Sequence, residues 1–165
     1  PEDVVAAMVN VQSQSTSNPT SIAQVAAEAA LNGDQSCIRP MVQAFRDRHD
    51  FVVPYLNGMR GIRCLPSGGA FYAFADVREA IRHLHEMHRL EKADDESFCD
   101  FILETAKVSV VPGSAFGTDG YMRISFATSM ENLQNAMQRI RHALEDCTAP
   151  ETRRESAAIP ADLDG

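Results

Sequence analysis

The sequence predicts an α+β fold, in which helices pack on one face of a mainly antiparallel sheet. Three observations lead to this prediction. The chain has 165 residues, of which 44% are hydrophobic, and this suffices for one domain with a buried core. The predicted elements run in the order helices, strands, helix, two strands and helix. The strands are short and follow one another mainly as hairpins, so the helices cover one face.

Charge and hydropathy exclude several classes of function. The net charge is −8 and the pI is about 5.0, which argues against a nucleic-acid-binding protein. No stretch approaches the roughly 18–20 apolar residues that a membrane span needs. We therefore expect neither nucleic acid nor membrane as a partner. Because the first residue is Pro1 and not Met, we expect a segment of a longer protein.

The cysteines indicate a reducing compartment. The four cysteines are widely spaced and form no CxxC pair, which excludes the usual zinc and redox motifs. They are Cys37, Cys64, Cys99 and Cys147. Free thiols are typical of the cytoplasm, so we expect a cytoplasmic protein.

The first third of the chain is predicted to be helical. Pro1–Asn10 is predicted to be a short helix, and the polar run Gln12–Asn18 a loop. Asn18-Pro19 then begins a second helix, because Asn is a good cap and Pro fits the first helical position. The buried stripe of this helix is expected to consist of Ile22, Val25, Ala26, Ala29 and Ala30.

A longer helix is predicted between Asp34 and Asn57, where apolar residues keep a 3.6-residue period. Pro40 and Pro54 interrupt the pattern, and each removes a backbone hydrogen bond from the helix. We therefore expect a late start or a bend near Pro40, and a kink or an early stop near Pro54.

After Gly58 the pattern changes to short strands and amphipathic helices. Ile62–Leu65 and the aromatic segment Ala70–Ala75 are predicted strands, separated by a Gly68-Gly69 turn. Further helices are expected over Arg78–Leu90, after a cap at Asp94 or Asp95, and after a cap at Ser129.

The most informative stretch is Val108–Ser125, which is predicted to be strand, turn and strand. The β-branched run Val108–Val111 is a strand signal, and Pro112-Gly113 ends it. In the second strand, alternation places Met122, Ile124 and Phe126 on the core face, and Tyr121, Arg123 and Ser125 on the other. A guanidinium held there is suited to binding a carboxylate or phosphate bidentately. A solvated surface arginine is the alternative that the pattern leaves open.

Three other groups have weaker signals. His83, His85 and His88 form the run HLHEMH, in which His85 and His88 are three residues apart on a predicted helix and could hold a metal ion. The zincin spacing is absent, however, and solvated histidines fit better. Ser114 in PGSAFG lacks the spacer residue of the G-x-S-x-G nucleophile motif. The hydroxyl-rich run before Pro19 suits either an anion or a plain capped loop.

Four stretches, in order, resemble one family. They are QSQSTSNPTSIAQVAAEAAL, GGAFYAFADV, VVPGSAFG and GYMRISFATSMENLQNAMQRI. Together they resemble the C-terminal part of the class I, fold-type I aminotransferases, which depend on pyridoxal phosphate. Within that family the bacterial aspartate aminotransferases are the most similar group. The resemblance extends over about Pro1 to Glu145.

The resemblance implies a domain organisation. Residues 1–18 match the end of the large cofactor-binding domain, 19–58 the inter-domain linker helices, and 59–146 the small domain that closes over substrate. Residues 147–165 carry prolines and charges without periodicity, and we expect a disordered tail there.

The resemblance also implies roles for four residues. Arg123 in YMRISFA matches the arginine that binds the substrate α-carboxylate, and Phe71 in GGAFY matches an aromatic residue near the substrate. Ser17 and Asn18 in TSNP match a loop that approaches the active site of the partner subunit. The implied parent is a homodimer that moves an amino group between an amino acid, aspartate or a relative, and a 2-oxo acid.

One essential residue of that family is missing. The family needs a lysine that forms a Schiff base with pyridoxal phosphate, and neither Lys92 nor Lys107 has the Ser-Lys setting of that residue. We therefore expect the cofactor to be bound mainly by an upstream domain and this chain to be inactive alone. The alternative is a non-catalytic module that binds a carboxylate or mediates dimerisation.

Overall fold

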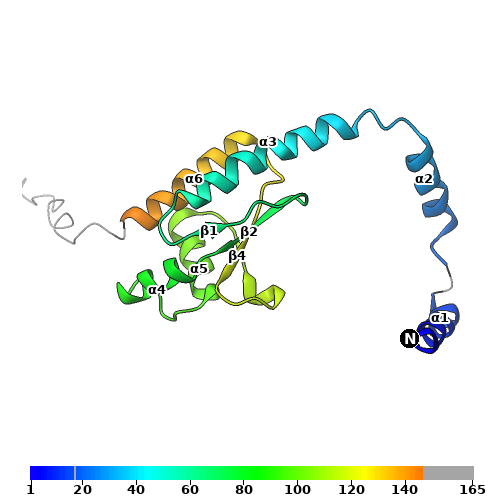
Figure 1. Cartoon of the computed structure of the whole chain (residues 1–165), viewed down its shortest axis with the longest axis horizontal. Helices are drawn as coiled ribbons and strands as arrows, with labels where there is room; N and C mark the ends of the chain where they lie inside the picture. The colour runs from blue at the N-terminus through cyan, green and yellow to red at the C-terminus, as the bar shows by residue number, and fades with distance from the viewer. Residues whose placement is uncertain (17, 147–165) are drawn as a thin grey trace, which may run out of the picture. The chain divides into compact units, whose positions relative to one another are not determined.

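The computed structural model describes residues 1–16 and 18–146 (Figure 1). Ser17 and the predicted tail 147–165 lie outside the described residues. Contacts divide the chain into two compact units, Pro1–Val42 and Gln43–Gly165. No helix of the described residues is long and apolar enough to cross a membrane.

The N-terminal unit contains helix α1 (Glu2–Ser15), helix α2 (Ser21–Asn32) and the start of helix α3 (Ile38–Asn57). The predicted loop Gln12–Asn18 begins too early, because α1 continues to Ser15. The hydroxyl of Ser15 donates to the Val11 carbonyl at 3.2 Å, so this polar run is accommodated within the helix. The cap of α2 is Thr20, not Asn18, since its Oγ1 accepts the Ala23 N–H at 3.3 Å.

The predicted buried stripe of α2 is exposed. Ile22 is 82% and Val25 66% exposed, and neither α1 nor α2 buries any residue. Helical spacing of apolar residues indicates which face is apolar, but not whether the same unit covers it. The pattern therefore predicted the helix correctly and its burial wrongly.

Helix α3 accommodates both of its prolines. Pro40 is the third helical residue, within the first turn, where no intrahelical partner for an N–H is needed. Pro54 lies inside the helix, which nevertheless continues to Asn57. Of the predicted kink or early stop, the early stop is therefore wrong, and the kink stays a prediction. Val52, Val53 and Leu56 of the same segment are buried. Their burial offsets the lost hydrogen bond at Pro54.

The C-terminal unit is built on a four-stranded sheet, ordered β1-β2-β4-β3 and antiparallel throughout. The strands are β1 (Arg63–Cys64), β2 (Tyr72–Asp76), β3 (Val111–Pro112) and β4 (Tyr121–Ser125). A strand was predicted over Val108–Val111, but the observed strand β3 is shorter and begins only at Val111. Pro112 belongs to it because β3 is at the sheet edge, where a missing N–H is tolerated.

Three further helices follow the strands: α4 (Arg78–Glu86), α5 (Asp95–Ala106) and α6 (Met130–Glu145). Helix α4 ends at Glu86 rather than at the predicted Leu90. The predicted caps of the other two are confirmed. Asp94 accepts the Ser97 N–H at 2.8 Å, and Ser129 accepts the Asn132 N–H at 3.1 Å.

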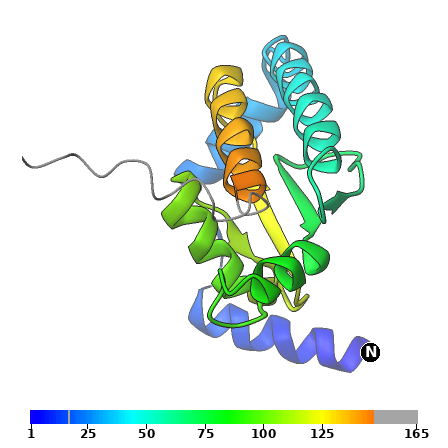
Figure 2. The ribbon, with the colours of Figure 1, turned by 90° about the vertical axis from the view of Figure 1, so that its left-hand side faces the viewer.

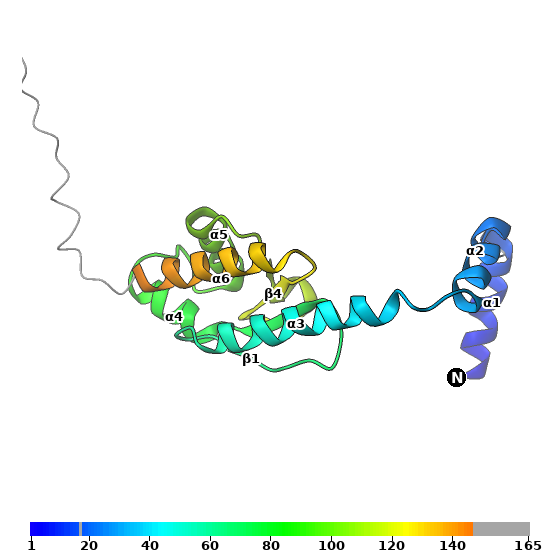
Figure 3. The same cartoon turned by 90° about the horizontal axis from the view of Figure 1, so that it is seen from above.

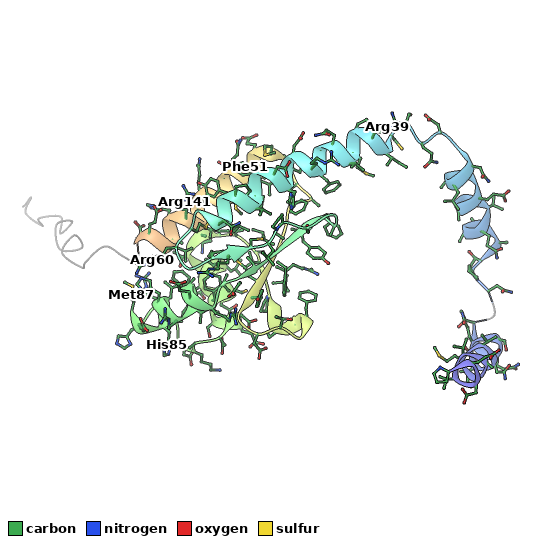
Figure 4. All side chains as sticks on the ribbon, in the orientation of Figure 1. Arg39, Phe51, Arg60, His85, Met87 and Arg141 are labelled. Carbon is green, nitrogen blue, oxygen red and sulfur yellow. The ribbon has the colours of Figure 1, made fainter. Side chains whose placement is uncertain are left out.

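The core lies between the inner face of the sheet and the helices, as the predicted α+β class requires. Met122, Ile124 and Phe126 of β4 and its extension are at most 4% exposed, which confirms the predicted alternation. Figures 2 and 3 show α3 and α6 side by side over the sheet. The Arg141 guanidinium of α6 (labelled in Figure 4) lies 4.1 Å from the ring centroid of Tyr55 in α3, which joins the two helices.

An amide side chain completes the edge of β1. The side-chain NH₂ of Asn57 donates to the Cys64 carbonyl at 2.8 Å, and its Oδ1 accepts the Cys64 N–H at 2.8 Å. The residue that ends α3 thus pairs with the edge strand as a neighbouring backbone would.

Candidate functional site

Arg123 lies at the centre of the outer sheet face. On β4 it pairs with Phe74 of β2 and with Val111 of β3, and its side chain is half-buried. Its guanidinium carbon lies 4.3 Å from the ring centroid of Phe116 and 5.2 Å from that of Tyr72. Within the described residues Arg123 forms no ion pair. Its hydrogen-bond donors therefore remain available to an anionic ligand.

Aromatic side chains form a layer around this arginine. The ring of Phe74 stacks on Tyr121, with centroids 5.1 Å apart and planes inclined by 14°. Phe74 also meets Phe116 edge to face at 6.5 Å. Such a layer desolvates a charged group placed within it and strengthens its interaction with an incoming opposite charge.

The acidic residue of the same strand pair already has a partner. Arg78 donates from Nε to Asp76 Oδ1 at 3.0 Å and from Nη2 to Oδ2 at 2.5 Å. These hydrogen bonds lower the pKa of the Asp76 carboxyl and raise the pKa of Arg78. Asp76 is thus paired with Arg78 and not with Arg123.

Phe71 lies directly before β2 and is 52% exposed. Its ring meets Tyr72 edge to face at 5.6 Å, and its carbonyl accepts the Phe126 N–H at 2.9 Å. Phe71 and Arg123 therefore share Tyr72 as a neighbour, and the structure brings these two predicted residues to the same region.

The other two predicted residues belong to the N-terminal unit. Asn18 is exposed in the connection between α1 and α2. Ser17 lies outside the described residues. Their predicted contact with a partner subunit stays a prediction.

The PGSAFG segment is a structural turn. Residues Gly113–Phe116 form the 3-10 helix η1, which directly follows β3. A Cβ atom at Gly113 would lie only 2.4 Å from the Thr118 carbonyl oxygen, so a larger residue does not fit without displacement. The buried Asp95 carboxylate accepts the backbone N–H of Ser114 at 2.8 Å. This carboxylate fixes the turn, and it does not activate the Ser114 hydroxyl.

The histidine segment has no metal-binding geometry. His83 and His85 lie on α4, whereas His88 follows the helix in a left-handed conformation with φ of 56°. Figure 4 shows His85 on the outer side of α4. Among the described residues, no group of three or more His, Cys, Asp or Glu side chains could hold a metal ion.

The two lysines of the chain, Lys92 and Lys107, lie outside the sheet that carries Arg123. Lys92 is exposed in the turn before α5, and Lys107 is the exposed left-handed residue that ends this helix. Neither lies on the strands that carry Arg123. Tyr72 and Phe116 were not predicted as site residues from the sequence. The alternation of Tyr72 and Phe74 in β2 does place Tyr72 on the outer face, whereas no sequence signal indicates Phe116.

Comparison with known proteins decides the family. The family model described as aminotransferase class I and II matches residues 1–140. The chain belongs to the class I and II aminotransferases. An aspartate/prephenate aminotransferase from Nitrosomonas europaea is 61% identical over 140 residues, which are 85% of this chain and 35% of that protein. An aspartate aminotransferase from Rhizobium meliloti is 42% identical over 145 residues, 88% of this chain and 35% of that protein.

Solved aminotransferase structures share the fold. A crystal structure of the Rhizobium meliloti aspartate aminotransferase matches with a TM-score of 0.70 at 40% identity, covering 88% of this chain and 36% of that one. The aromatic aminotransferase from Pyrococcus horikoshii matches with a TM-score of 0.73 at 32% identity, covering 90% and 38%. The chain thus spans about a third of the length of the aminotransferases that it matches.

Proposed function

We propose that this chain is the C-terminal, substrate-carboxylate-binding part of a pyridoxal-phosphate-dependent aminotransferase. The proposal rests on the surroundings of Arg123. This cation lies among aromatic rings on the outer sheet face and has no ion-pair partner among the described residues. Its place in the YMRISFA motif of the family agrees with this role. Phe71 and Arg123 both contact the ring of Tyr72, and Phe71 would contact the same substrate.

The physical basis of the role is bidentate recognition. Two parallel N–H···O bonds from a guanidinium fix both the position and the plane of a carboxylate. A substrate held in this way has its reacting carbon oriented, which supplies part of the catalysis without any covalent chemistry from this chain. In the family the cofactor supplies the electron sink, and the residues that bind it would lie outside this chain.

The names of the relatives guide the choice of substrates. The 61% identical relative is named for aspartate and prephenate, and the Rhizobium relative for aspartate. We therefore propose aspartate as the amino donor and 2-oxo acids, including prephenate, as acceptors. Within this proposal the protein is a cytoplasmic homodimer, in which Ser17 and Asn18 approach the partner subunit and the small domain closes over substrate to exclude water.

The first test uses the 165-residue chain with pyridoxal phosphate. Lys92 and Lys107 are exposed surface residues, so we expect the chain to transfer no amino group from aspartate to a 2-oxo acid. We also expect no visible absorption band of a Schiff base that disappears when one specific lysine is replaced. Chain variants with Lys92→Arg or Lys107→Arg serve as matched controls for adventitious lysine adducts. A stoichiometric band that one of these substitutions abolishes would contradict the proposal that the Schiff-base lysine lies outside this chain.

The gene sequence upstream of the codon for Pro1 distinguishes the proposed aminotransferase from the non-catalytic module. A preceding domain with a Ser-Lys motif, whose product transfers amino groups, supports the aminotransferase. A start codon directly before Pro1 supports the non-catalytic carboxylate-binding or dimerisation module instead.

A further inference from the structure

The guanidinium of Arg123 lies between aromatic rings from the two neighbouring sides of its strand. In the sheet order β1-β2-β4-β3, Tyr72 comes from β2 on one side of β4. Phe116 comes from η1, which follows β3 on the other side. The ring centroids lie 5.2 Å and 4.3 Å from the guanidinium carbon, so Phe116 makes the closer contact.

Aromatic partners hold an arginine without using its hydrogen-bond donors. The negative face of a ring attracts the cation, but it does not compete for the in-plane N–H groups as a carboxylate would. Asp76, the acidic residue of the neighbouring strand β2, is bound by Arg78 instead. The arrangement therefore orients the guanidinium and leaves its N–H donors available to a ligand.

The turn before Phe116 is built to fix this ring. The Thr118 N–H donates to the Gly113 carbonyl at 3.1 Å, and the Gly117 N–H donates to the Ser114 carbonyl at 2.9 Å. Gly117 adopts a φ of +77°, which favours glycine, and the buried Asp95 anchors the Ser114 backbone at 2.8 Å. This network explains PGSAFG, whose serine has no catalytic geometry, as the support of an aromatic residue.

We propose that Phe116 is a positioning residue that acts through Arg123, keeping the guanidinium oriented for the substrate carboxylate. The assignment deepens the proposed function and rests on it. Phe116 itself is 49% exposed and contributes little to the core, so its role is separable from folding.

The experiment observes the Nε–H signal of Arg123 by ¹⁵N NMR in the 165-residue chain, free and titrated with succinate. We expect a dispersed, ordered signal in the parent chain, and one resembling a solvent-exposed arginine in Phe116→Leu. Loss of the ring should weaken succinate binding by about twofold to thirtyfold, the range of a cation–π contact. Phe116→Tyr keeps the ring and should restore both signal and affinity.

Leu103→Ala is the matched control, since Leu103 is 48% exposed and lies on α5, a helix that carries neither Arg123 nor the two rings beside it. It should leave the Arg123 signal unchanged. An Arg123 signal that is the same in Phe116→Leu and the parent chain, in a folded protein, overturns the positioning role. Failure of succinate to bind the parent chain, with an Arg123 signal that still depends on Phe116, would support the positioning role of Phe116 and contradict the proposed carboxylate-binding function of Arg123.

Discussion

Arg123→Lys should lower kcat/KM of the full-length aminotransferase by about tenfold to several hundredfold. Lysine keeps the positive charge but loses the planar fork, and with it one of two charge-assisted hydrogen bonds. Such a bond is worth roughly 1.5–3 kcal/mol, more than an ordinary one. Lysine also loses the stacking against Phe116 and Tyr72. Steady-state kinetics with aspartate measures the effect.

The stability of this variant should be almost unchanged. The Arg123 side chain projects from the outer face of the sheet, while its neighbours Met122 and Ile124 are buried in the core. Arg63→Lys is the matched control, since Arg63 is an exposed arginine on β1 of the same sheet, and its kcat/KM should equal that of the parent. An unchanged kcat/KM in a folded Arg123→Lys enzyme would remove Arg123 from the site.

Phe126→Ala should destabilise the C-terminal unit by about 3–5 kcal/mol, the range for removing a buried phenylalanine ring. Phe126 is 1% exposed, and its ring lies 6.3 Å from that of Phe45 and 6.1 Å from that of His49, both on α3. Removing it opens a cavity between the end of the central strand and this helix. Urea unfolding of the chain, followed by circular dichroism, measures the loss.

The matched control for this prediction is Phe71→Ala, the same substitution at a ring that is 52% exposed. Its effect on the free energy of unfolding should stay within about 1 kcal/mol. Equal losses in the two variants would show that Phe126 does not carry the contact between α3 and the sheet.

The sequence predicted the sheet well where local rules decide the outcome. Alternation with a period of two assigned Met122 and Ile124 to the core, and Arg123 to the outer face, because a strand offers only two faces. The caps at Asp94 and Ser129 were equally local, since a side chain three residues before an N–H accepts from it.

Predictions failed where the outcome depends on distant parts of the chain. The stripe of α2 around Ile22 and Val25 is apolar, but spacing cannot tell whether anything covers it. The persistence of α3 through Pro54 depends on burial of the neighbouring Val52 and Val53 against the sheet. The site was predicted in part for the same reason. Arg123 could be found from its strand and motif, whereas Phe116 meets it only through the strand order of the folded sheet.

A crystal structure of the full-length protein with bound succinate would show directly whether Arg123 binds the substrate carboxylate. We expect one carboxylate of succinate with both oxygens about 2.7–2.9 Å from guanidinium nitrogens of Arg123. The guanidinium should still lie between Tyr72 and Phe116 in that complex. Succinate bound at another arginine, with Arg123 exposed to solvent and free of any anion, would show that Arg123 does not bind the substrate carboxylate.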